Sequence, residues 1–297
     1  MRRATDNNEA WGVIEKFSEI LRPKEAEEPI LAAPVRAAIF EWLTEIRARE
    51  ELEAAKITPR YSALLYGPPG CGKTTLAHHL AARLDLPLVC VGAEHLVSSF
   101  LGATGQNIAR VFQALQLVAN ESIVLFDEID SIGTKRSGEQ SGANTERNSF
   151  LTVLLTRMES FKGIFMAATN RHDNIDPALW RRFGMQIDVA LPGADERFAI
   201  LCRYLQPYHM PPASIELLTD LTRGASPSLL RQLMEGVKRV LILGPKLKRD
   251  TSDPVAVFAQ IISAIAPPPD MAAPHLWRVD TAISELKDME WPPKLQD

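Results

Sequence analysis

The stretch "GPPGCGKTT" (67–75) carries the most specific chemical pattern in the sequence. It fits G-x-x-x-x-G-K-[ST] between an apolar run and a helical pattern, the context of a phosphate-binding loop rather than an ordinary glycine-rich turn. Backbone N–H groups freed by the glycines would surround phosphate oxygens, with Lys73 reaching the β- and γ-phosphates and the Thr74 hydroxyl binding Mg²⁺. The predicted nucleotide-binding residues are Gly67, Pro68, Pro69, Gly70, Cys71, Gly72, Lys73, Thr74 and Thr75.

Two carboxylates follow another apolar run, in "SIVLFDEID" (122–130). Ligands of open α/β sheets bind at the carboxyl ends of strands. Asp127 is therefore predicted to hold Mg²⁺, and Glu128 to polarise the attacking water. Asp130 is interpreted as a structural cap. Asn170 ends the next apolar run, and as a third polar group at the same sheet edge it is predicted to hydrogen-bond the water and the γ-phosphate.

Five short apolar runs alternate with helical segments near 73–84, 105–119 and 144–159. The runs are "YSALLYG", "LPLVCVG", "SIVLFDE", "GIFMAATN" and "MQIDVAL". This alternation predicts an α/β fold, a parallel sheet with helices on both faces. Three helical patterns without intervening strands follow Pro192, which predicts a small all-helical lid domain.

The expected organisation has four parts. Residues 1–56 form an N-terminal leader, loosely ordered over its first 30 residues, and an amphipathic helix. Residues 57–192 form the α/β nucleotide-binding domain and 193–265 the helical lid. Residues 266–297 begin with the breaker "APPPDMAAP" and form a C-terminal tail without an assigned structure.

The composition excludes several classes of protein. The 297 residues are 46% apolar and 24% charged with a net charge of −4, so no global basic surface points to nucleic acid or to an anionic membrane. Three widely spaced cysteines form no zinc or disulfide pattern and favour a reducing, cytoplasmic location. The N-terminus lacks a secretory signal, and the longest apolar stretch is too short to span a bilayer.

Residues 57–240 resemble the AAA ATPases, in particular their protein-remodelling group. The matching stretches are "LLYGPPGCGKT", "FLG", "IVLFDEIDSI", "AATNR", "IDPALWRRF" and "TRGASPSLL". The resemblance implies a P-loop NTPase fold, ATP and Mg²⁺ as ligands, and a Walker A loop with Lys73 and Thr74. It also implies a Walker B pair at Asp127 and Glu128, a sensor residue at Asn170, and assembly into a ring, usually of six subunits.

Ring assembly gives two further stretches a role by resemblance. In AAA rings the segment "ALWRRFG" faces the neighbour's ATP, so Arg182 is assigned as the arginine finger with Arg181 as a partner. Many relatives carry another arginine where this chain has Met185, which leaves the two-finger arrangement open. The stretch Phe100, Leu101, Gly102 occupies the position of the loop that lines the central channel and grips an extended polypeptide.

The sequence thus predicts an ATP-hydrolysing ring that remodels, unfolds or disassembles protein substrates, with any proteolysis or adaptor function on a separate subunit. Neither nucleic acid nor membrane is expected as a partner. A nucleic-acid-loading AAA protein is the leading alternative, and the basic cluster "KLKRD" at 246–250 is as well explained as a helix-end charge run. Arg231 is interpreted either as a second sensor or as a solvated lid residue. A small-molecule P-loop kinase is the second alternative.

Overall fold

The computed structural model describes residues 2–92, 96, 103–131, 142–269, 271–278 and 280–295. The predicted pore residues Phe100, Leu101 and Gly102 lie outside these ranges. The chain divides into two compact units, which are described separately. The first contains Met1–Pro29, Ala33–Gly67 and Lys73–Val189, and the second contains Ile30–Ala32, Pro68–Gly72 and Ala190–Asp297.

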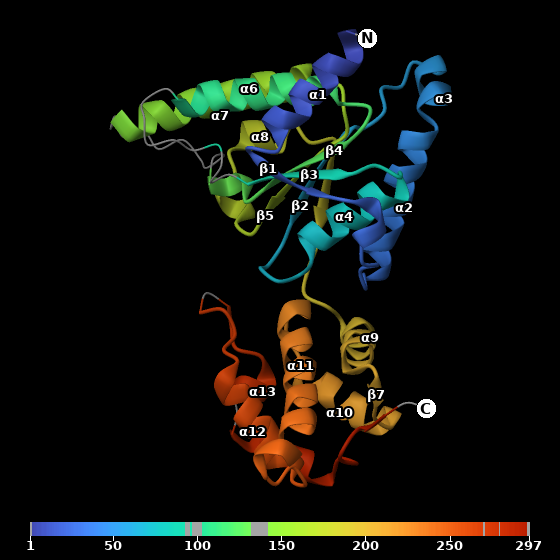
Figure 1. Cartoon of the computed structure of the whole chain (residues 1–297), viewed down its shortest axis with the longest axis vertical. Coiled ribbons are helices and arrows are strands. Elements are labelled where there is room, and N and C mark those ends of the chain that lie inside the picture. The colour runs from blue at the N-terminus through green and yellow to red at the C-terminus, as the bar shows by residue number, and fades with distance from the viewer. Residues whose placement is uncertain are drawn as a thin grey trace. The chain divides into compact units, whose positions relative to one another are not determined.

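The first unit is built on a six-stranded sheet with the order β1-β3-β4-β5-β2-β6 (Figure 1). Every neighbouring pair is parallel except β1 with β3, which is antiparallel. The strands are β1 (Ser18–Leu21), β2 (Ser62–Tyr66), β3 (Leu88–Gly92), β4 (Ile123–Asp127), β5 (Phe165–Thr169) and β6 (Met185–Asp188). All five strands expected from the apolar runs are present, and the α/β prediction is confirmed. Because β5 lies between β4 and β2, the carboxyl ends of these three strands are neighbours.

Helices cover both faces of this sheet (Figure 1). One face carries a core that includes Val124, Phe126 and Ile108, and the alternate residues of the strands point to the other face, where α4 contacts β3, β4 and β5. The strands are therefore buried on both sides, which explains why they read as continuous apolar runs. The helices are α1 (Arg2–Ile14), α2 (Ala33–Arg47), α3 (Arg49–Ala54), α4 (Lys73–Arg83), α6 (Ala103–Leu117), α7 (Gly142–Ser160) and α8 (Pro177–Trp180), with short 3₁₀ turns η1 (Pro23–Glu25), η2 (Ile129–Ser131) and η3 (His172–Asn174).

The N-terminal residues differ from the loosely ordered leader expected from the sequence. Helix α1 packs against α6 and buries Ala10 and Ile14 in the core of the sheet. Strand β1 then pairs with β3 from Ser18↔Val91 to Leu21↔Leu88. The added strand covers the β3 edge, which would otherwise present unpaired backbone groups.

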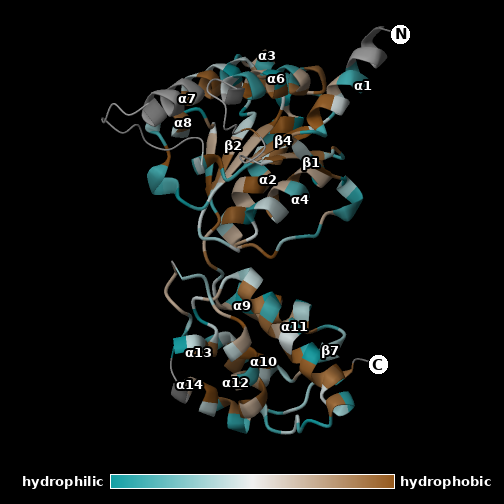
Figure 2. Cartoon of the chain, turned by 60° about the vertical axis from the view of Figure 1, so that its left-hand side comes forward, coloured by the Kyte–Doolittle hydropathy of each residue, from teal (hydrophilic) through white to brown (hydrophobic). Residues whose placement is uncertain are grey.

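The second unit is mainly helical and has its own core. Its helices are α9 (Ala194–Leu205), α10 (Pro212–Leu221), α11 (Pro227–Leu243), α12 (Pro254–Ala264), α13 (His275–Arg278) and α14 (Asp280–Ser284), with turns η4 (Pro245–Leu247) and η5 (Glu285–Asp288). Ser226 caps α11 by accepting a hydrogen bond from the Leu229 N–H, and Pro227 opens that helix. Brown, hydrophobic segments of these helices are visible in Figure 2.

Two details of the second unit differ from the sequence-based expectation. The unit contains a short antiparallel ladder between β7 (Tyr208–His209) and β8 (Lys294–Leu295), so it is not purely helical. The segment interpreted as a tail contributes Leu276 and Leu286, both almost fully buried, to the helical core. Its short helices carry too few residues to show a periodic pattern, which is why the sequence left them unassigned.

Candidate nucleotide-binding site

The loop after β2 has a backbone that requires glycine. Gly67, Gly70 and Gly72 have φ values of +145°, +74° and +85°, a region that side chains disfavour. A Cβ atom on Gly67 would also lie 2.3 Å from the carbonyl oxygen of Val189, and one on Gly70 would lie 2.2 Å from the Ser228 hydroxyl oxygen. The glycines of the motif therefore set the shape of the loop, as a phosphate cradle requires.

Lys73 begins helix α4 directly after this loop and is only 7% exposed. Its Nζ atom donates a hydrogen bond of 2.9 Å to the carbonyl oxygen of Gly67, at the other end of the loop. The ammonium charge thus lies beside the loop backbone. Because α4 runs for eleven residues, its N-terminal N–H groups add a partial positive charge at the same end. Both features suit an anion such as a phosphate group.

Thr74 and Asp127 meet across the carboxyl edge of the sheet. The Thr74 hydroxyl donates a 2.7 Å hydrogen bond to Oδ2 of Asp127, and Oδ1 accepts a 2.9 Å bond from the Glu128 N–H. A hydroxyl and a carboxylate provide the oxygen donors that Mg²⁺ prefers, so these two residues fit the predicted metal. Burial, and then the charge of Asp127, raise the pKa of the neighbouring Cys90 thiol to about 12, so this thiol is neutral near pH 7.

Glu128 and Asn170 lie at the ends of adjacent strands, and both are exposed. Glu128 has a left-handed backbone with φ +51°, which is uncommon for a residue with a side chain and is often found at functional sites. Ser131 stabilises this turn, since its N–H and its hydroxyl donate to the Glu128 carbonyl at 3.0 and 2.8 Å. The sheet therefore brings the predicted water-activating and sensor residues to the same edge.

Arg181 and Arg182 follow helix α8 and are exposed. The next residue, Phe183, is buried and stacks on Phe165 at 6.0 Å between ring centroids. The Ser62 hydroxyl donates to the Arg182 carbonyl at 3.2 Å. The arginines thus project from a segment that is anchored to the sheet on one side.

The sequence did not indicate a partner for Arg182, but the structure provides one. Its Nη2 lies 2.5 Å from Oε1 of Glu159, near the end of α7, and both side chains are about half exposed. The two residues are far apart in sequence, so no spacing rule would have paired them. Met185, which left the two-finger arrangement open in the sequence, begins strand β6 and is buried.

Arg231 lies on α11 in the helical unit. Its Nε donates to Glu235 at 2.8 Å, and its guanidinium lies 5.3 Å from the centre of the Tyr204 ring. These contacts fix Arg231 on the surface of its own helix and along α9. Ser228 was not singled out from the sequence, yet its N–H donates to the Gly70 carbonyl at 3.1 Å.

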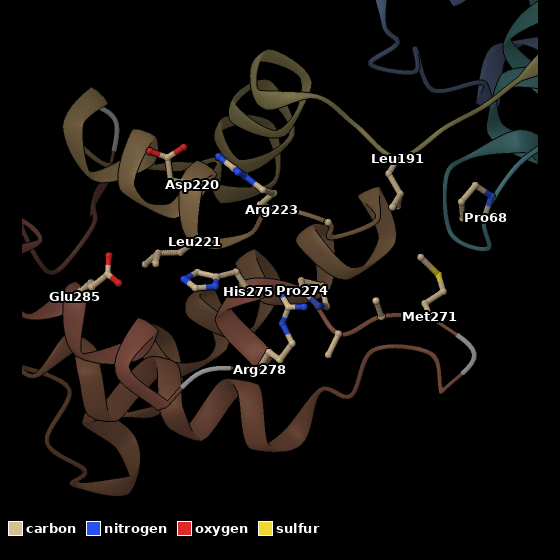
Figure 3. A pocket seen from close by; sticks show the side chains of 13 residues that line it. Pro68, Leu191, Asp220, Leu221, Arg223, Met271, Pro274, His275, Arg278 and Glu285 are labelled. Atoms are coloured by element: carbon tan, nitrogen blue, oxygen red, sulfur yellow. The ribbon is translucent and has the colours of Figure 1, made fainter.

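The helical unit also contains a cavity of about 770 Å³ (Figure 3). Arg223, His275 and Arg278 lie toward its middle, while Asp220 and Glu285 lie on one side. The formal charges of the arginines and carboxylates balance. Pro68 is the one predicted site residue among those that line this cavity.

Comparison with known proteins agrees with this geometry. Residues 63–191 match the sequence profile of the ATPase family associated with various cellular activities (AAA). This part of the chain is an AAA ATPase domain. Two crystal structures of the FIGL-1 AAA domain, one in complex with ADP, resemble the fold with TM-scores of 0.68 and 0.69. Sequence identities are 20% and 21%, and the matches cover 93% and 89% of this chain and 92% of each solved chain.

Two curated relatives match this chain with higher sequence identity than these two crystal structures do. The proteasome-activating nucleotidase of Thermococcus onnurineus is 33% identical over 233 residues, which cover 74% of this chain and 58% of that protein. The ATP-dependent zinc metalloprotease FtsH of Acidimicrobium ferrooxidans is 39% identical over 178 residues, 58% of this chain and 27% of that protein. The chain therefore spans little more than half the length of the nucleotidase.

The described residues contain neither a membrane-spanning helix nor a cluster of metal-binding side chains. No helix there is long and apolar enough to cross a membrane. No group of three or more His, Cys, Asp or Glu side chains in the same residues is arranged to hold a metal ion. For these residues the Thr74–Asp127 pair remains the only metal position that the sequence predicts.

Proposed function

We propose that this chain hydrolyses ATP and, as a homo-oligomeric ring of six copies, uses the reaction to unfold or remodel protein substrates. The observation that carries the proposal is the contact between Thr74 and Asp127 beside Glu128, within the matched AAA domain. The similarity to proteasome-activating nucleotidases favours a protein substrate over the nucleic-acid-loading alternative. A separate protease or adaptor would complete such a system, and a cytoplasmic location suits it.

The residues divide the chemistry between them. Lys73 and the loop amides would bind the phosphates, and Glu128 would accept a proton from the attacking water while Asn170 orients that water. Arg182 of a neighbouring copy would stabilise the charge that develops on the transferred phosphoryl group. Thr74 and Asp127 would hold Mg²⁺, which supplies neutralisation of the phosphate charge when bound.

We assign the loop that contains Phe100 to binding of the protein substrate. Phe100→Ala is expected to leave the melting temperature and basal ATPase nearly unchanged, because a ring that grips substrate contributes to neither. Unfolding of a tagged fluorescent protein, followed by loss of its fluorescence, should collapse, while Phe100→Tyr should retain much of the activity. A large drop in melting temperature for Phe100→Ala would instead identify a core residue, since truncating a buried phenylalanine costs about 3–5 kcal/mol.

An exposed apolar groove on the sheet-containing unit supports association between copies. It has a volume of about 710 Å³ and lies between α2 and the residues after α3. Phe40 and Ile57 in its lining are 69% and 53% exposed.

A second exposed apolar surface lies at the end of α11 and on η4. It contains three exposed apolar residues and two lysines, namely Ile242, Leu243, Leu247, Lys246 and Lys248. The groove lining has two glutamates and one arginine, so the α11–η4 patch of a second copy complements it in charge and in apolar surface.

A charge placed in this groove should weaken assembly. Phe40→Lys is expected to raise the protein concentration needed for ATP-dependent assembly by about tenfold, since a buried lysine at the contact is costly. Leu117→Lys is the matched control, because Leu117 is also 53% exposed but lies on α6. Sedimentation velocity measures both. Equal assembly of the two variants at every concentration would show that copies do not meet at this groove, and a defect in binding another protein instead would identify a different occupant.

A further inference from the structure

The turn after Glu128 is joined to the end of β5 by a buried hydroxyl. Thr169, which is only 1% exposed, donates its hydroxyl proton to Oδ1 of Asp130 over 2.7 Å. The same oxygen of Thr169 accepts a 3.0 Å hydrogen bond from the Arg171 N–H. Both polar functions of the hydroxyl are thus satisfied, and the backbone on either side of Asn170 is held by one side chain.

The other end of this connection reaches Glu128. Asp130 lies in the 3₁₀ turn Ile129–Ser131, and Ser131 of that turn donates twice to the Glu128 carbonyl oxygen. Ile129 is fully buried in the sheet core, which prevents the turn from shifting as a whole. A chain of short contacts therefore runs from Glu128 through the turn to Asp130, to Thr169 and on to the residues around Asn170.

We propose that Asp130 is a positioning residue, which through the Thr169 hydroxyl fixes the segment carrying Asn170 against the turn carrying Glu128. The structural cap expected from the sequence is a different role, because the carboxylate of Asp130 contacts β5 rather than the turn that contains it. This inference rests on the proposed ATP hydrolysis, since it concerns the relative placement of the two groups that would handle the attacking water. Misplacement by about 1 Å can cost on the order of 10²-fold in rate.

Each substitution removes a different part of the hydrogen bond between Thr169 and Asp130. Asp130→Ala removes the acceptor and leaves the Thr169 hydroxyl buried without it. Asp130→Asn keeps an acceptor oxygen at Oδ1 and loses only the charge. Thr169→Val keeps the branched shape of the side chain but removes the hydroxyl, which is the donor of the same hydrogen bond. Asp173→Asn is the matched control, because this carboxylate lies in the 3₁₀ turn η3 after Asn170 and its side chain is 88% exposed.

The test compares steady-state ATPase kinetics of these variants in the full chain. Asp130→Ala and Thr169→Val should each lower kcat by about 10- to 100-fold with KM within about twofold, and the double variant should be no worse than either single one. Asp130→Asn should restore most of kcat, and Asp173→Asn should match the unchanged protein. If Asp130→Asn loses as much as Asp130→Ala, or if the two single losses multiply in the double variant, the proposal is overturned.

A second measurement needs neither nucleotide nor turnover. Amide hydrogen exchange of Arg171 should become faster in Asp130→Ala and in Thr169→Val, because its acceptor is freed or removed, and should stay slow in Asp130→Asn. Unchanged exchange in Asp130→Ala would contradict the proposal even if kcat falls. A chain that shows the expected exchange pattern but hydrolyses no ATP would instead contradict the proposed function and leave the structural connection in place.

Discussion

Glu128→Gln should keep ATP bound and lose turnover. Glutamine has nearly the same shape as glutamate but cannot accept the proton of the attacking water, so kcat is expected to fall by about 10²–10⁴-fold. Binding should persist, because Lys73, Thr74 and the loop backbone are untouched. Equilibrium binding of a fluorescent ATP analogue and a phosphate-release assay measure the two properties separately.

The matched control is Glu121→Gln, an exposed carboxylate just before the start of β4. It removes the same charge from the opposite end of the strand and should leave kcat unchanged. The same variant pair tests whether ATP retention captures substrate, since Glu128→Gln should hold ATP and a bound protein together. Normal turnover in Glu128→Gln would mean that another group activates the water.

The parts of this site that the sequence predicted are those fixed by local pattern. The glycines, Lys73 and Thr74 form one contiguous motif, and Asp127 and Glu128 follow an apolar strand that runs parallel to its neighbours. A parallel sheet places the ends of such strands at one edge whatever the details of packing. The contact of Thr74 with Asp127 then follows from the order of the strands.

The parts that the sequence did not predict depend on contacts between distant segments. Glu159 meets Arg182 only because α7 packs beside α8. Strand β1 has four residues, too few for a clear alternation, and it is defined by its pairing with β3. Asp130 was assigned from its neighbours in sequence, whereas its hydrogen-bond partner lies on the next strand of the sheet.

The pair formed by Glu159 and Arg182 bears on how a finger would work in a ring. An exposed ion pair of this kind contributes little free energy, typically about 0–1 kcal/mol. Glu159 therefore orients the guanidinium without holding it strongly, and a neighbour's phosphate can compete for it. The segment behind the arginines is anchored by Phe183 and by the Ser62 hydroxyl, so a change of partner need not move the backbone.

If Arg182 acts on the neighbour's ATP, two inactive variants should restore activity when mixed. Arg182→Ala alone should lose about 10³-fold in kcat, the lower end of the effect of arginine fingers, and Lys73→Ala alone should lose nucleotide binding. In a ring of head-to-tail contacts, randomly mixed copies place an intact site against an intact finger at about a quarter of interfaces, so ATPase activity should reappear. Arg157→Ala, at an exposed arginine on α7, is the control and should be active unmixed. Mixtures that stay inactive at every ratio, although sedimentation shows that the variants assemble together, would mean that Arg182 does not act between copies.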